Sequence, residues 1–94
     1  MICLLLEEKV LIKNKTGLHA RPAAQFVQKA SSFESEINII FEDKEVNAKS
    51  IMGVMSLGVG KGKEITIKAD GEDSEKAVKE LVDFVNIEMP KEDH

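Results

Sequence analysis

Residues 37–48, INIIFEDKEVNA, contain the pattern on which the predicted fold depends. Apolar side chains occupy every second position of 37–42, which is the period of a strand with one buried face. The same alternation returns in residues 45–49, and Asp43-Lys44 between the two runs predicts a tight turn. The segment is therefore predicted to be a β-hairpin whose second strand ends near Lys49.

A helix is predicted before this hairpin. Ala23, Phe26, Val27 and Ala30 recur at i, i+3, i+4 and i+7, which is the period of an amphipathic helix. Pro22 fits its first turn, where a backbone N–H has no partner inside the helix. We therefore expect the helix to begin near residue 20.

Three further segments complete the long elements. A first strand is predicted over residues 8–14 and a fourth over residues 65–69, both from alternating apolar side chains. The last helix is predicted to be capped by Asp73 or Ser74, and its apolar face runs from residue 77 to 85.

A short helix of about two turns is predicted after the hairpin. Ser50 is a favoured N-cap residue, and Gly58 is a plausible residue just beyond the helix end. Within this helix two apolar pairs, Met52 with Met55 and Val54 with Leu57, lie on different sides, and so short a helix cannot bury both against one sheet. We expect one pair to be exposed, and an exposed methionine patch would suit a protein with several partners.

The element order β-α-β-β-α-β-α indicates helices covering one side of a mainly antiparallel sheet, an α+β fold. That architecture hosts many functions and identifies none of them.

Composition excludes several classes of protein. A net charge of −4 with no Trp or Tyr makes direct nucleic-acid binding unexpected. The apolar start of the chain, residues 1–6, lacks a basic flank and is too short for a membrane span or a signal peptide, so we expect a cytoplasmic protein. Cys3 has no partner cysteine with which it could form a disulfide or a metal site. The acidic cluster at 72–75 is interpreted as compensation of a helix dipole and not as a metal site. We therefore expect no metal or cofactor.

Residues 17–24, GLHARPAA, place a histidine and an arginine at the entrance of the first predicted helix. Backbone N–H groups and the positive end of the helix dipole favour an anion there. Neutral imidazole can take a phosphoryl group near pH 7, so His19 is the candidate acceptor. Arg21 carries a planar charged fork that matches phosphate oxygens. The alternative is a helix-cap histidine beside a solvated arginine.

The glycine-rich stretch 58–63, GVGKGK, is interpreted as a turn. A phosphate-binding P-loop needs a glycine five positions before the Gly-Lys pair, and a helix rather than a strand should follow it. Ser50 is most simply a cap, but a phosphate there would place about −1.5 to −2 charges beside a helix N-terminus.

Two segments together resemble the HPr family, the histidine phosphocarriers of the bacterial sugar phosphotransferase system. They are residues 16–23, TGLHARPA, and 49–58, KSIMGVMSLG, and the similarity spans about residues 7–88. The resemblance implies an open-faced β-sandwich with sheet order 1-4-2-3 and three helices on one face. It also implies a carrier rather than an enzyme in the strict sense.

The resemblance assigns roles to individual residues. His19 would be phosphorylated at Nδ1 by enzyme I, itself charged by phosphoenolpyruvate, and Arg21 would steady the phosphate. Ser50 would be the regulatory site of an ATP-dependent HPr kinase/phosphorylase. The docking patch for partners would consist of Ala20, Ile51, Met52 and Met55.

The partners implied are enzyme I, the IIA domains of sugar permeases and, for the seryl-phosphorylated form, a LacI-type catabolite regulator. A purely regulatory relative is the alternative, and it would lack the active histidine, so His19 argues against it. A binding module without phosphate chemistry would leave the His-Arg pair unexplained.

One departure from the family concerns the start of the chain. Residues 1–94 are expected to form a single HPr-like domain, with residues 1–6 as an extra segment. That segment would lengthen the first strand, form an oligomer contact or reflect an upstream start codon. Residues 89–94 are expected to form a frayed tail.

Overall fold

The protein is described from a computed structural model that covers residues 5–13, 17–18 and 20–89. The elements in chain order are β1 (Leu5–Leu11), α1 (Ala20–Ser31), β2 (Glu36–Phe41), β3 (Lys44–Asn47), α2 (Ile51–Ser56), β4 (Glu64–Asp70), α3 (Ser74–Asp83) and η1 (Phe84–Glu88). This is the predicted order, with one additional helical segment at the end.

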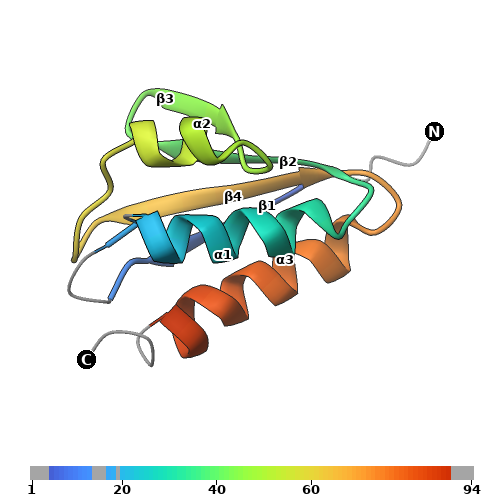
Figure 1. Ribbon diagram of the computed structural model, residues 1–94. Coiled ribbons are helices and arrows are strands. Elements are labelled where there is room, and N and C mark those ends of the chain that lie inside the picture. Colours follow the sequence, from blue (N-terminus) through green and yellow to red (C-terminus); the bar gives the residue numbers. More distant parts are fainter. Residues whose placement is uncertain (1–4, 14–16, 19, 90–94) are drawn as a thin grey trace.

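The four strands form one antiparallel sheet with the order β1-β4-β2-β3. Figure 1 shows α1 and α3 running side by side across one face of this sheet, with α2 beside β3. Among residues 5–13, 17–18 and 20–89, no helix lies on the opposite face (Figure 1). The expected open-faced α+β sandwich with strand order 1-4-2-3 is confirmed.

Along β2 and β4, buried residues alternate strictly with exposed or half-buried ones, and this alternation separates the two faces of the sheet. Ile39 of β2 lies opposite Ile67 of β4 and Val46 of β3, so apolar side chains from three strands meet under the helices. From the helices, Phe26 of α1 meets Phe84 at a ring centroid distance of 6.1 Å in an edge-to-face arrangement. The core therefore lies between the sheet and the helical layer.

The hairpin turn lies one residue earlier than predicted. Phe41 pairs with Lys44, so the turn residues are Glu42 and Asp43, and Glu42 has a positive φ of 55°. This register keeps the side chains of β2 and β3 in phase across the buried face. The third strand ends at Asn47 rather than near Lys49, because the Asn47 side-chain oxygen accepts a hydrogen bond from the Lys49 N–H at 2.8 Å and turns the chain.

The first strand also differs from its prediction. It spans Leu5–Leu11 rather than residues 8–14, and Leu5 and Leu6 pair with Asp70 and Ala69 of β4. Part of the segment considered extra thus lengthens the first strand, because β4 extends far enough to pair with it. The expectations for residues 1–4 and 14–16 lie outside the described residues.

The C-terminal helix continues beyond α3 as a single π-helical segment, η1. The N–H of Met89 bonds to the carbonyl of Phe84, five residues earlier. Phe84, Val85 and Met89 are all buried. The frayed tail expected to begin at residue 89 is therefore wrong for Met89, which is fully buried in the core, whereas residues 90–94 lie outside the described residues.

Asp73 occupies the N-cap position of α3, but its carboxylate makes no capping bond there. It accepts hydrogen bonds from the N–H groups of Glu34 at 2.8 Å and Ser35 at 2.9 Å, and from the Ser35 hydroxyl. These bonds lower the pKa of Asp73, the Ser35 hydroxyl contributing most. The side chain ties the start of α3 to the loop between α1 and β2 and does not act as a simple helix cap.

None of the helices in the described part of the chain is long and apolar enough to cross a membrane.

Candidate functional site

The start of α1 carries Arg21, the member of the predicted phosphate-binding pair that the structure describes. Arg21 is exposed in the first turn, and Pro22 beside it is buried. This arrangement follows from the sequence, because proline tolerates the first turn and its apolar ring can pack inward. His19 directly precedes the helix in sequence and lies outside the described residues.

The residues just before His19 rest on the glycine-rich loop between α2 and β4. The Leu18 N–H donates to the Val59 carbonyl oxygen at 2.9 Å. Gly17 has a positive φ of 65°, and a Cβ there would overlap the Val59 carbonyl oxygen and lie 2.7 Å from the Gly60 Cα. Leu18 itself is only 2% exposed. The backbone entering the site is thus fixed against another loop.

A second pair of backbone bonds joins the same two loops. The Ile12 N–H donates to the Lys63 carbonyl and the Gly62 N–H donates to the Ile12 carbonyl, each at 2.8 Å. The stretch 58–63 therefore acts as a supporting turn. Sequence reasoning predicted the turn but missed its contact with residues 17–18, because nothing local in the sequence signals a contact across about forty residues.

The two chain segments that contribute α1, α2 and the supporting loop carry charges of one sign only. Residues 9–33 and 46–63 contain no Asp or Glu in the sequence, although the whole chain carries a net charge of −4. Lys61 and Lys63 of the supporting loop are exposed, as is Arg21, and α1 has no acidic residue in its first turn. With the helix dipole, this distribution favours a bound anion at the start of α1.

Ser50 caps α2 as predicted. Its hydroxyl oxygen accepts a hydrogen bond from the Gly53 N–H at 3.2 Å, and its carbonyl accepts from the Val54 N–H at 3.0 Å. The side chain is half-buried. A phosphate on this oxygen would stand at the N-terminus of α2, next to its exposed face.

The apolar residues of α2 divide between core and surface. Val54 and Leu57 are buried, whereas Met52 is 78% and Met55 43% exposed. The methionine pair is therefore the exposed one of the two pairs, and Ile51, 40% exposed, extends it. The side of α2 facing away from the sheet is an apolar surface.

Lys49 was not singled out from the sequence. Its ammonium group donates to the Phe33 carbonyl at 2.7 Å, while its backbone N–H bonds to Asn47. The residue before Ser50 is thus tied to the loop that follows α1. No local pattern signals this bond, because the two residues are sixteen positions apart.

α2 packs against α1 on the helical side of the sheet (Figure 1). Ala20, the first residue of α1, is exposed, as are Ile51, Met52 and Met55. The two helices that carry the predicted docking residues are therefore in contact. Arg21, predicted to bind an anion, lies in the first turn of α1, and Ser50, the predicted modification site, caps α2.

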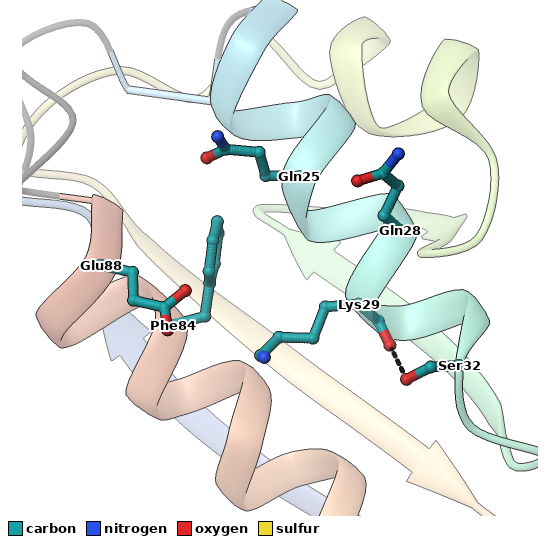
Figure 2. A pocket seen from close by; sticks show the side chains of 6 residues that line it. All are labelled: Gln25, Gln28, Lys29, Ser32, Phe84 and Glu88. Carbon is teal, nitrogen blue, oxygen red and sulfur yellow. Dashed lines mark hydrogen bonds between the residues drawn. The ribbon is translucent and has the colours of Figure 1, made fainter.

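A shallow cavity of about 420 Å³ lies between α1 and η1, as Figure 2 shows. Its lining is mainly polar and comprises Gln25, Gln28, Lys29, Ser32, Phe84 and Glu88. It contains none of the predicted site residues. Within the described residues, no group of three or more His, Cys, Asp or Glu side chains could hold a metal ion.

The arrangement suits the temporary holding of an anionic group at an exposed helix start, next to the exposed apolar surface of α2. An exposed helix start beside an apolar surface is suited to contact with another protein, whereas sites that turn over small molecules are usually enclosed pockets.

Comparison with known proteins gives consistent matches over most of the chain. The family PTS-HPr, described as "PTS HPr component phosphorylation site", matches residues 6–86. The HPr-like protein Crh of Halalkalibacterium halodurans is 51% identical over 84 residues, which cover 89% of this chain and 100% of that protein.

Comparison with solved structures points to the same family. HPr-C-His of Thermoanaerobacter tengcongensis is 57% identical with a TM-score of 0.84, covering 86% of this chain and 91% of the other. The phosphocarrier protein HPr of Bacillus anthracis is 48% identical, also with a TM-score of 0.84, covering 86% and 96%. With its fold, its helix start and these matches, the chain belongs to the PTS-HPr family.

Proposed function

We propose that this protein is a phosphocarrier of the sugar phosphotransferase system, which accepts a phosphoryl group from phospho-enzyme I on His19 and passes it to the IIA domains of sugar permeases. One observation carries the proposal. A histidine directly precedes α1, with Arg21 in the first turn, inside the segment matched by a family described by its phosphorylation site. The proposal places the protein in the cytoplasm.

The transfer step needs little beyond position and charge. The Nδ1 lone pair of neutral His19 attacks phosphorus, the bond between phosphorus and the donor group of enzyme I breaks, and its electron pair remains on the donor. The imidazole proton stays on Nε2. The guanidinium of Arg21 and the first-turn N–H groups of α1 would stabilise the negative charge that develops on the phosphoryl oxygens. Transfer to a IIA domain reverses these roles.

Partner recognition is assigned to the exposed surface formed by Ala20, Ile51, Met52 and Met55. Methionine side chains are flexible and polarizable, so one patch can adapt to differently shaped partners. This property suits a carrier that must meet a donor and several acceptors in turn.

Regulation is assigned to Ser50. An ATP-dependent HPr kinase/phosphorylase would add a phosphate to its hydroxyl, and the new charges would lie beside the docking surface. The phosphorylated form would bind a LacI-type catabolite regulator and so contribute to carbon catabolite repression.

The proposal is tested by incubating the chain with enzyme I and phosphoenolpyruvate. We expect phosphate that is lost in acid, as a phosphoramidate is, and that a IIA domain then removes. Incubation with the kinase and ATP should instead give acid-stable phosphate, which Ser50→Ala abolishes. If enzyme I transfers no phosphate, the carrier proposal is wrong.

The second candidate is a purely regulatory protein acting through Ser50 alone. Its support is the similarity to Crh of Bacillus subtilis, which is described as the catabolite repression HPr and is 50% identical to this chain. The two candidates separate cleanly, because a purely regulatory protein would take phosphate only from the kinase, whereas a carrier takes it from both sources. His19 favours the carrier.

A further inference from the structure

Gly17 and Gly58 share a backbone conformation but differ in their surroundings. Their φ angles are 65° and 62°, in the left-handed region that favours glycine. A Cβ at Gly58 would meet no non-neighbouring atom of the described residues within 4 Å. A Cβ at Gly17 would overlap the Val59 carbonyl oxygen and approach the Gly60 Cα to 2.7 Å. Of these two glycines, Gly17 alone is pressed against a second backbone segment.

The contact at Gly17 is continued by a hydrogen bond. The Leu18 N–H donates to the same Val59 oxygen at 2.9 Å, and both Leu18 and Val59 are almost fully buried. The geometry points to Gly17 and Val59 as positioning residues of the phosphoryl-transfer site, which set the place of the chain entering α1. This inference rests on the proposed function, in which His19 is the acceptor.

The effect on the acceptor follows from covalent geometry. Consecutive Cα atoms are fixed at about 3.8 Å, so a displacement of Leu18 is passed to the next residue, His19. Transfer requires the reacting atoms to meet in a narrow range of distance and angle, and a misplacement of about 1 Å can cost about 100-fold in rate. The docking residues of α2 are not part of this contact.

Gly17→Ala is the direct test, and Gly58→Ala is its matched control because both introduce alanine at a similar positive φ. We expect Gly17→Ala to lower the maximal rate of phosphorylation by enzyme I by about 10- to 100-fold. The KM of enzyme I for the chain should stay within about twofold, and Gly58→Ala should leave the rate within about twofold of wild type. The exchange of the Leu18 amide, followed by NMR, should accelerate in Gly17→Ala while the amides of β4 remain protected.

A second pair of variants avoids the steric clash in case Gly17→Ala does not fold. Val59→Ala trims the buried residue that presents the carbonyl, and Val78→Ala trims an equally apolar buried residue on α3. When the two variants are compared at equal loss of melting temperature relative to wild type, Val59→Ala should have a lower maximal rate of phosphorylation than Val78→Ala. Its Leu18 amide should also exchange faster.

Folded Gly17→Ala with the wild-type maximal rate would overturn the inference, and so would equal losses in Gly17→Ala and Gly58→Ala. Equal rates in Val59→Ala and Val78→Ala would do the same. If the wild-type chain accepts no phosphate, the proposed function fails instead. In that case the exchange rate of the Leu18 amide still tests whether Val59 holds this segment in place. An unchanged Leu18 exchange rate in Gly17→Ala and Val59→Ala would show that it does not.

Discussion

Arg21 stands in the first turn of α1, where its guanidinium is exposed and no acidic side chain of that turn competes for it. Arg21→Glu replaces a phosphate-binding cation with an anion at the point where negative charge develops. We expect transfer from enzyme I to slow by about 100-fold or more. Rates at low salt, compared with those of a Lys79→Glu variant at an exposed position of α3, separate a local effect from the change in net charge. An Arg21→Glu variant as fast as Lys79→Glu would remove Arg21 from the site.

At the scale of a single element, Ser50 has two roles in α2 that predict opposite results. As a cap, its hydroxyl holds the Gly53 N–H, so Ser50→Ala should cost about 1 kcal/mol of stability, whereas aspartate is itself a good cap. As a control site, it borders the docking surface, so Ser50→Asp should weaken binding to enzyme I while Ser50→Ala should not. Titration of both variants against enzyme I, with melting temperatures as the control, decides. If Ser50→Asp binds enzyme I tightly and Ser50→Ala binds it weakly, regulation by charge at Ser50 is contradicted.

The elements themselves were predictable where one local period dominates. The alternation in β2 and β4 and the apolar stripe of α1 indicated the buried faces, because each element packs against a single layer. The start of β1 was missed because it depends on β4, which pairs with Leu5 and Leu6 from the far end of the chain. The π-helical turn at Phe84–Glu88 was missed because a 3.6-residue period does not anticipate an extra residue in a turn.

The candidate site, like the elements, was predictable only where the signal in the sequence is local. Residue type and position near a helix start indicated Arg21, and local capping preference indicated Ser50. The support of residues 17–18 by Val59 depends on how the whole chain folds, so no local signal could reveal it.

At the scale of the whole molecule, Asp73 links the start of α3 to the loop before β2. Its pKa is lowered in the folded chain, chiefly by the Ser35 hydroxyl, from an ordinary value of 3.8. Folding is therefore stabilised by ionised Asp73 above that value, and this contribution is lost as the pH falls through the lower folded pKa. Asp73→Asn should lower the melting temperature at neutral pH and flatten its decline in acid. Glu75→Gln, in the first turn of the same helix, controls for the helix dipole. Equal acid profiles for wild type and Asp73→Asn would show that these bonds contribute nothing.

The most direct test of the account compares the two histidines of the chain, His19 and His94. After incubation with enzyme I and phosphoenolpyruvate, wild type and His94→Ala should each carry acid-labile phosphate, and His19→Ala should carry none. Matching melting temperatures would show that the substitutions leave the fold intact. Acid-labile phosphate on folded His19→Ala, or its absence from the wild-type chain, would contradict the assignment of His19 as the phosphoryl acceptor.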